Sequence, residues 1–547
     1  MTTGRVPAGG DPASSRAGAI LLLLGLVLVS TGRSLGNGFA FDDVPIILEN
    51  AQVHAVSPPW VYALQSYWPP LNLGDAYRPW TVWWFSLQWG LSGGAPWLFH
   101  LGNLLLTAAA TLLVHRLALE LATPFGAVVA AALFAVHPVH VEATGNVVGQ
   151  GELWMTVFSV AGALVYLRAR RRGALGGPAR LTLAALLVLA AAAKEQGIVL
   201  PALLLLVEWF GVPRRPGEPR LRIAGAAFGL LAVVGAGFLA ARFAILGDLG
   251  GGPPAAGLAG RGLGERALVM APLALDWFRL LLWPRDLLAQ FSPPAHGAAP
   301  VWSAAAVAGI LALVGTAVAF GVAARRAPGV ALGIGWIAVG ILPVSNVLFP
   351  TGVLVAERTL LLPSVGIVLV AAALADGLGR RGPRARLAVT AAALLLIGAG
   401  AARSYSRQAV WRDNPTLFAQ TVIDEPLAYR GWFVYGRELV RRGQPDRAAA
   451  MFSRAGTLWG GDHRVFEEWG QVLRTQGRCR DAIPIFERGV AADPRGTLAR
   501  SRLFECLMTE RRYPEAVLVA QAGLDLGATE FQAGLDRARR QLEGSNR

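Results

Sequence analysis

Apolar runs separated by short polar segments fill the first 402 residues of this 547-residue chain. A membrane-spanning helix rises about 1.5 Å per residue and needs about 20 apolar residues to cross a bilayer. Runs that approach this length lie at 17–36, 97–119, 125–137, 151–167, 181–193, 197–211, 223–244, 301–323, 330–343, 359–376 and 387–402, with a shorter run at 266–283. The pattern predicts an all-α, polytopic transmembrane bundle of about eleven helices, in which 266–283 lies in the interface or re-enters.

The pattern changes after residue 403, where the sequence becomes soluble and rich in Arg and Glu. Positions 34 residues apart carry the same side chain: Phe418, Phe452 and Phe486; Ala448, Ala482 and Ala516; Gly443 and Gly477. A 34-residue period with glycine between helices is typical of tetratricopeptide repeats, whose helical hairpins stack into a solenoid with a concave groove. We therefore predict a transmembrane domain at 1–402 and a repeat domain at 403–547 that binds an extended polypeptide.

Composition agrees with a membrane protein, and the charge pattern predicts its orientation. Hydrophobic residues make up 54% of the chain, too many for a soluble protein. The net charge of +15 does not indicate a nucleic-acid partner, because arginines cluster in loops such as 168–172 and 214–222. Basic loops stay in the cytoplasm. With a cytoplasmic N-terminus, the loops 37–96 and 245–300 and the repeat domain are extracytoplasmic.

The N-terminus and the two cysteines bear on how the chain is processed and stabilised. Arg5 and Arg16 precede an apolar run and allow a second reading of the N-terminus as a cleavable signal sequence, although cleavage would detach the following loop from its anchor. The two cysteines, Cys479 and Cys506, sit in no CxxC or histidine-containing frame. Neither a structural zinc site nor a disulfide scaffold is therefore expected.

Ionisable residues gather at the outer ends of the apolar segments. Asp42 and Asp43 follow the first run directly, in the tryptophan-rich loop 37–96. Others end later runs: His137, His140 and Glu142; Lys194 and Glu195; Glu357 and Arg358. Unpaired ionisable groups at membrane depth cost a few kcal/mol each and usually mark a substrate path or reaction centre. We predict such a centre here; the alternative is that the two aspartates only begin a solvated loop. The glycines in 245–300 fit either a mobile loop over this centre or a linker.

Six short motifs occur in order along the chain: Phe41-Asp42-Asp43-Val44-Pro45, Tyr77-Arg78-Pro79-Trp80, the stretch 134–142, Lys194-Glu195-Gln196-Gly197, Leu280-Leu281-Leu282-Trp283-Pro284 and Ala356-Glu357-Arg358-Thr359. As a set, covering nearly the whole chain, they resemble the transmembrane and tetratricopeptide-repeat (TMTC-like) O-mannosyltransferases of the GT-C superfamily. The resemblance implies a polyprenyl-phosphate sugar donor and assigns the acidic motif of the first outer loop to Asp42 and Asp43. The family often has many repeats and this chain has few, which leaves the acceptor open.

The residues support the same chemistry. Transfer of a sugar to a serine or threonine hydroxyl needs a base, usually a carboxylate. We favour Asp42, with Asp43 as its electrostatic neighbour. The phosphate leaving group needs cations, and Lys194 is the only lysine in the chain, although it alternatively pairs with Glu195. Further predicted phosphate contacts are Arg358, Arg78, His137 and His140.

The remaining polar residues have supporting roles. Glu142, Glu195 and Glu357 lie beside the predicted contacts, and His100 and Asn103, three residues apart on one helix face, either contact the donor or pack between helices. A divalent metal on His137, His140 and Glu142 is an alternative that we do not favour, because the spacing is not helical and no second cluster supports it. No cofactor is therefore required.

The sequence thus predicts a glycosyltransferase of GT-C type, in a bacterial inner membrane, that moves a hexose from a polyprenyl-phosphate donor to serine or threonine of an extracytoplasmic protein held by the repeats. Mannose is the sugar that the resemblance implies. Two rival functions stay open. One is a membrane-anchored scaffold in which the repeats do all the work, and the other is a polymerase or ligase of lipid-linked glycans.

Overall fold

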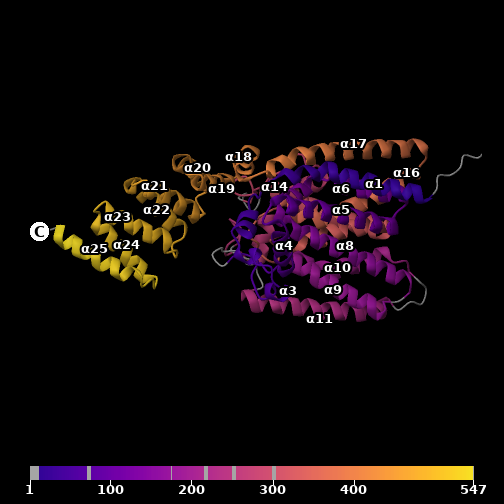
Figure 1. Cartoon of the computed structure of the whole chain (residues 1–547), viewed down its shortest axis with the longest axis horizontal. Coiled ribbons are helices and arrows are strands. Elements are labelled where there is room, and N and C mark those ends of the chain that lie inside the picture. The colour runs from indigo at the N-terminus through magenta and orange to yellow at the C-terminus, as the bar shows by residue number, and fades with distance from the viewer. Residues whose placement is uncertain are drawn as a thin grey trace, which may run out of the picture. The chain divides into compact units, whose positions relative to one another are not determined.

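The computed structural model describes residues 12–69, 76–173, 175–214, 220–248, 254–297 and 303–545, and the regular structure within these ranges is helical (Figure 1). This confirms the predicted all-α class. The chain divides into two compact units. Unit 1 comprises Met1–Pro254, Gly260–Ala289 and Val301–Leu417, and unit 2 comprises Ala255–Ala259, Gln290–Pro300 and Phe418–Arg547. Glycines 250–252 of the predicted outer segment lie outside the described residues.

Seven helices of the described part are long and apolar enough to span a membrane, and a bent pair, Pro124–Val136 (α6) with Pro138–Gly145, would make an eighth. The seven lie in α1 (Pro12–Thr31), α5 (Pro96–Leu121), α8 (Gln150–Arg171), α11 (Arg220–Leu246), α14 (Ala304–Arg326), α16 (Leu361–Gly379) and α17 (Pro383–Gln408). The chain is therefore a multi-pass membrane protein. The predicted number of about eleven crossings is not matched, because runs such as 181–193 and 197–211 form shorter helices, α9 (Gly177–Ala193) and α10 (Leu200–Leu206).

Burial separates the inner helices of unit 1 from the outer ones. The most apolar part of α8 is 83% buried and that of α16 is 67% buried, whereas the corresponding parts of α11, α14 and α17 are only 11–17% buried. In Figure 1 the long helices of this unit run roughly parallel. Helix α8 is therefore central, and its first turn carries Glu152.

Close packing fixes the segment that precedes α16. Helix α15 (Pro328–Ile341) contacts α16 through Gly333 and Gly366, and a Cβ atom on either glycine would collide with the carbonyl oxygen of the other. Small residues let membrane helices approach this closely. The short helix η8 (Glu357–Leu360), which leads directly into α16, is held at a set position as a result.

Short helices form the loop 37–96 and its supports. They are η2 (Val44–Leu48), α2 (Ala51–His54), α3 (Pro59–Tyr62) and α4 (Pro79–Ser92), followed later in unit 1 by η3 (Pro138–His140), α7 (Val141–Gly145), η4 (Val147–Gly149) and η5 (Glu195–Val199). Helix α4 begins at Pro79, as expected for a proline that tolerates the first helical turn. The run 266–283 forms α12 (Leu263–Met270) and α13 (Ala274–Leu282), each too short to cross a bilayer.

Unit 2 is a stack of helical hairpins. The helices are α19 (Tyr429–Arg441), α20 (Pro445–Leu458), α21 (His463–Thr475), α22 (Cys479–Ala492), α23 (Leu498–Thr509), α24 (Tyr513–Asp525) and α25 (Phe531–Ser545). Within the first two hairpins the buried rings of Phe452 and Phe486 lie against Gly436 and Gly470, where a Cβ atom would approach the ring to 2.6 and 2.5 Å. The 34-residue period therefore corresponds to one hairpin, and the unit is a tetratricopeptide-like solenoid.

The turn inside each hairpin requires a left-handed residue. Gly443 and Gly477 supply it at φ +67° and +75°, but the equivalent third position is Arg511, at φ +59°. A left-handed backbone costs about 1–2 kcal/mol at a residue that has a Cβ atom. Glycine avoids this cost, but it loses more conformational entropy on folding, which offsets part of the gain. We expect Arg511→Gly to raise the free energy of unfolding of unit 2 by up to about 1 kcal/mol. Thermal denaturation should show this, with Gly477→Ala destabilising as the matched control; a lower melting temperature for Arg511→Gly would contradict the assignment.

Candidate active site

The two aspartates of the loop 37–96 have different environments. Asp43 is fully buried and accepts hydrogen bonds from the backbone N–H groups of Ala40 (3.2 Å), Val147 (3.2 Å) and Val148 (2.8 Å). Its carboxylate therefore ties the loop to η4. Burial raises the pKa of Asp43 to about 7, although the three backbone hydrogen bonds oppose this.

Asp42 lies beside Arg358 instead. Its Oδ2 is 3.7 Å from Nη2 of Arg358, and its side chain is 20% exposed. The preceding residue, Phe41, has a left-handed backbone (φ +55°), and its N–H donates to Oδ1 of Asn414 at 2.6 Å. A bulky residue holds this conformation only where its surroundings enforce it. The strained turn directs the two neighbouring carboxylates to different places.

Arg358 is surrounded by three carboxylates. Its backbone N–H donates to Oε2 of Glu142 at 2.8 Å, and its Nη1 pairs with the same side chain. Its Nε lies 3.4 Å from Oε1 of Glu152, and Asp42 stands at Nη2. Each nitrogen of the guanidinium thus faces an acid, which fixes the orientation of its planar fork.

Glu152 connects Arg358 to the only lysine. Its Oε1 also forms an ion pair with Nζ of Lys194, which begins the turn after α9. Both side chains are buried, 2% and 7% exposed. Burial is the main reason that the pKa of Lys194 falls to about 8; the charges of Arg78 and Arg358 act in the same direction and Glu152 opposes them. Arg78 is linked to this group through its ion pair with Glu195, the residue that follows Lys194 in the chain.

Arg78 is positioned by Glu195 and by an aromatic ring. Its Nε lies 2.9 Å from Oε2 of Glu195, whose Oε1 accepts the backbone N–H of Tyr77 at 2.8 Å. The guanidinium carbon stands 4.6 Å from the centre of the Tyr67 ring, within cation–π range.

We call these seven ionisable residues the ion cluster: Asp42, Arg78, Glu142, Glu152, Lys194, Glu195 and Arg358. They come from five separate segments: the loop 37–96, α7, α8, the start of η5, and η8. Only Asp42, Arg78, Glu195 and Arg358 are partly exposed, at 17–27%, and the other three are nearly or fully buried. A ligand therefore meets two guanidinium groups and two carboxylates.

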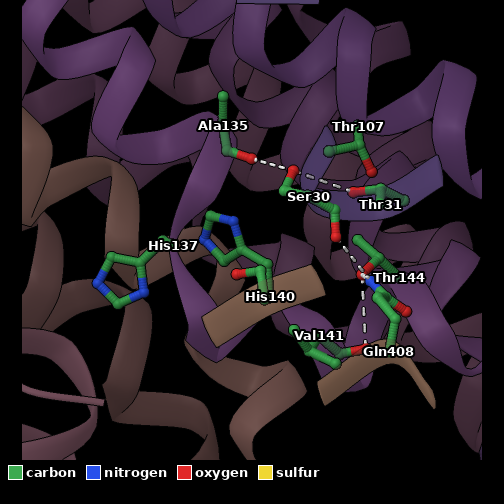
Figure 2. Close-up of a pocket in the computed structure, with 10 residues that line it drawn as sticks. Ser30, Thr31, Thr107, Ala135, His137, His140, Val141, Thr144 and Gln408 are labelled. Atoms are coloured by element: carbon green, nitrogen blue, oxygen red, sulfur yellow. Dashed lines mark hydrogen bonds between the residues drawn. The ribbon is translucent and has the colours of Figure 1, made fainter. Parts of the chain in front are cut away.

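The predicted histidines lie outside the ion cluster. Nε2 of His137 is 3.1 Å from the carbonyl oxygen of Leu281, and Nε2 of His140 is 2.8 Å from Oγ of Ser364. Figure 2 shows both rings at a small polar cavity, where Gln408 donates to Thr144 at 2.7 Å. Its volume for a water-sized sphere is about 10 Å³, close to the lower limit for one water. A contact of either histidine with the donor phosphate stays a prediction.

The other predicted supporting residues hold the scaffold together. Nε2 of His100 is 3.1 Å from the carbonyl oxygen of Gly38, and Asn103 donates from Nδ2 to two carbonyl oxygens of the α7–η4 segment at 3.0 Å. Both side chains are fully buried. Glu357 accepts the N–H of Leu288. His100 and Asn103 thus hold the loops that carry Asp42 and Glu142, and Glu357 holds the segment at Leu288.

Sequence reasoning missed Glu152, the acid that joins Lys194 to Arg358. A signal was present, because Glu152 is an acid at the start of an otherwise apolar run. Within the described ranges no three His, Cys, Asp or Glu side chains are arranged to hold a metal ion. That the reaction requires no metal stays a prediction.

Comparison with known proteins gives relatives of one kind, although no family model matches the chain. A protein O-mannosyl-transferase of Caenorhabditis elegans, F38B6.6, is 28% identical over 73% of this chain and 57% of its own length. Human protein O-mannosyl-transferase TMTC4 is 28% identical over 79% of this chain and 65% of its own length. Drosophila melanogaster Tmtc2 is 42% identical over a shorter stretch, 31% of this chain and 19% of its own.

The chain thus spans less than two thirds of the length of these curated relatives. Among solved structures, the tetratricopeptide domain of P58(IPK) matches at 14% identity, covering 71% of this chain and 99% of that domain, with a TM-score of 0.21 that is too low to support an argument. The sequence relatives confirm the resemblance drawn from the motifs: the curated homologues of this chain are TMTC protein O-mannosyl-transferases.

Proposed function

We propose that this protein is a membrane glycosyltransferase that moves a hexose, mannose by its relationship, from a polyprenyl-phosphate donor to serine or threonine of a protein. The observation that carries the proposal is the partly exposed pair of Asp42 and Arg358, 3.7 Å apart. Arg78 joins the same ion cluster through Glu195. A base and cations for a phosphate leaving group are the two requirements of this reaction, and here they adjoin.

The reaction assigns a role to each exposed group. The acceptor hydroxyl attacks the anomeric carbon, the bond from that carbon to the phosphate oxygen breaks, and the hydroxyl proton passes to Asp42. Negative charge then collects on the departing polyprenyl phosphate, where Arg358 and Arg78 stabilise it through charge-assisted hydrogen bonds. A single displacement of this kind inverts the anomeric configuration. Asp43, whose oxygens already accept three backbone hydrogen bonds, positions the loop.

Lys194 takes a positioning role in this proposal in place of direct phosphate contact. It is buried and pairs with Glu152, which in turn contacts Arg358. Its charge keeps Glu152 ionised and so keeps the guanidinium of Arg358 oriented. Removing that charge would leave a buried carboxylate without one of its two cations, which is costly.

This role predicts an alkaline limit on activity. The pKa of Lys194 is lowered to about 8, so its charge is present below that pH and is lost as the pH rises through it. We expect the transfer rate at low donor concentration to fall above about pH 8. Arginine does not deprotonate in this range, so Lys194→Arg should remove the alkaline limb even if its overall rate is lower. A wild-type rate that stays constant to pH 9.5 would contradict this role.

The acceptor protein and the side of the membrane complete the proposal. Unit 2 would bind the acceptor in the groove of its helical hairpins, as tetratricopeptide-like solenoids offer extended concave surfaces. The ion cluster and unit 2 would both face away from the cytoplasm, in agreement with the basic loops on the opposite side. In a bacterium this side is the periplasm.

A direct assay tests the transfer. The full chain, purified in detergent, is incubated with labelled polyprenyl-phosphate mannose and peptides that contain serine or threonine. We expect label on a hydroxyl oxygen of the peptide, and none with heat-denatured protein. Growth of a lipid-linked glycan without peptide labelling would replace this function by the polymerase alternative, and a lack of any product from several polyprenyl-phosphate hexoses would favour the scaffold.

A further inference from the structure

Arg78 carries hydrogen-bond donors that the protein does not use. Its Nε donates to Oε2 of Glu195 at 2.9 Å, but neither Nη1 nor Nη2 donates a hydrogen bond to any residue in the described ranges. Every guanidinium nitrogen of Arg358, by contrast, has a carboxylate oxygen within 3.7 Å. The side chain of Arg78 is also 22% exposed. A planar fork with one nitrogen anchored and two terminal nitrogens open suits two oxygens of one anion.

A tyrosine fixes the plane of this fork. The guanidinium carbon of Arg78 lies 4.6 Å from the centre of the Tyr67 ring. Tyr67 is only 1% exposed, and its backbone N–H donates to the carbonyl oxygen of Ala76 at 2.7 Å, two residues before Arg78. The ring covers one face of the guanidinium, and Glu195 holds its Nε edge. These two contacts leave the terminal edge as the part of the side chain that can meet a ligand.

The ring of Tyr67 belongs to the apolar cluster that also supports the acidic motif. This cluster includes two residues of η2, the short helix that follows Asp43. It also includes Val147 and Val148 of η4, whose N–H groups donate to Asp43. Close-packed side chains hold their positions. A packed core therefore sets the position of the Tyr67 ring relative to the acidic motif.

We propose that Tyr67 is a positioning residue for the donor: its ring, together with Glu195, holds Arg78 so that Nη1 and Nη2 bind the two non-bridging oxygens of a polyprenyl phosphodiester. This role rests on the proposed function and identifies the group that recognises the donor's phosphate at the same site. A phosphodiester offers two equivalent oxygens that share one negative charge, which one guanidinium can match with two parallel hydrogen bonds. Sequence reasoning gave Tyr67 no role, because its ring meets Arg78 only in the folded loop.

Equilibrium binding of a short donor analogue tests this role without turnover. The full chain, immobilised in detergent, is incubated with labelled farnesyl phosphate, and farnesol serves as the ligand that lacks only the phosphate. We expect tight binding of farnesyl phosphate alone, with displacement by polyprenyl-phosphate mannose and none by phosphatidylglycerol. Tyr67→Leu should weaken this binding about 3–30-fold, the range of a cation–π contact. Tyr67→Phe keeps the ring and removes a hydroxyl that forms no hydrogen bond in the described ranges, so it should bind like the wild type.

Tyr62→Leu is the matched control for lost packing. Tyr62 lies in the same apolar cluster as Tyr67, and its hydroxyl donates to the carbonyl oxygen of Ala55 at 2.5 Å. Tyr62→Leu should therefore lower the melting temperature at least as much as Tyr67→Leu does, yet leave the binding of farnesyl phosphate unchanged. In an Arg78→Gln background, Tyr67→Leu should weaken binding no further, because the ring acts through the guanidinium.

Three outcomes would overturn the role of Tyr67. They are equal losses of binding in Tyr62→Leu and Tyr67→Leu, a full effect of Tyr67→Leu in the Arg78→Gln background, and a loss in Tyr67→Phe as large as in Tyr67→Leu. Farnesol that binds as tightly as farnesyl phosphate, or displacement by phosphatidylglycerol, would contradict recognition of the donor phosphate by Arg78. Binding that follows the expected pattern without any transfer to peptides would reject the proposed reaction and support this site.

Discussion

Asp42→Asn is expected to lower the transfer rate by about 10²–10⁴-fold, the contribution of a general base. The amide of asparagine cannot accept the proton of the acceptor hydroxyl. It has the same size as the carboxylate of Asp42, which is 20% exposed and lies 3.7 Å from Arg358. We therefore expect the melting temperature to change little. The measurement is the peptide transfer assay at saturating donor, with thermal stability recorded on the same preparation.

Asp43→Asn is the matched comparison, and it should act mainly on stability. Both carboxylate oxygens of Asp43 accept backbone N–H groups, Oδ1 from Val148 and Oδ2 from Ala40 and Val147. An amide has one oxygen, so at least one buried donor would face an NH₂ group, at a cost of about 1–3 kcal/mol. Equal loss of transfer in both variants without loss of stability in Asp43→Asn would refute the division of roles.

The pH dependence of stability provides a second readout for Asp43. Its pKa in the folded protein, about 7, lies above the ordinary value of 3.8, so the folded state binds the proton more tightly than the unfolded state does. Stability should therefore fall as the pH rises from about 4 to 7 and be regained on acidification through that window. The Asp43→Asn variant should lack this dependence, while Asp42→Asn should keep it.

Replacement of Arg358 is expected to lower the transfer rate by a factor similar to that of Asp42→Asn, but through the leaving phosphate and not through the base. Arg358→Gln removes the charge that stabilises the leaving phosphate, and loss of one such donor costs about 10²–10³-fold in rate. It also leaves the buried Glu142 without its cation. We expect a lower kcat, a higher KM for the donor and a lower melting temperature.

Two further variants distinguish recognition of phosphate from a general loss of charge. Arg358→Lys keeps the charge but cannot meet Asp42, Glu142 and Glu152 with separate nitrogens, so it should recover only part of the rate. Arg168→Gln removes an arginine from a partly exposed pair with Glu120, which keeps Arg171 as a partner, and should leave both rate and stability near those of the wild type. A donor KM unchanged in Arg358→Gln would argue against a phosphate contact.

The sequence alone was sufficient for the features that local patterns encode. Hydropathy shows which segments avoid water, so the all-α, multi-pass character followed from composition and run length. The 34-residue spacing of Phe452 and Phe486 reflects one contact repeated in successive hairpins, and the structure places each ring on a glycine. The six motifs also contain every residue of the ion cluster except Glu152.

The number of spanning helices was not determined in the same way. Short apolar runs such as 197–211 satisfy a hydropathy criterion whether they cross a membrane or fill the interior of a bundle. Helix α10 has seven residues and continues into η6 (Val207–Gly211); its Leu200, Leu203 and Leu204 are fully buried among neighbouring helices, whereas Leu205 is 51% exposed. Burial inside the protein and burial in lipid demand the same side chains, so the local sequence cannot separate them.

Only the tertiary structure distinguished Asp42 from Asp43, because the choice depends on backbone N–H groups of Val147 and Val148, more than 100 residues away. The same is true of Glu152, which has a role only because α8, α9 and η8 bring Lys194 and Arg358 to its carboxylate. The sequence shows which residues carry a charge, but which charges pair depends on the distances between them in the folded chain. Distances between remote segments are set by helix packing, which no short stretch of sequence contains.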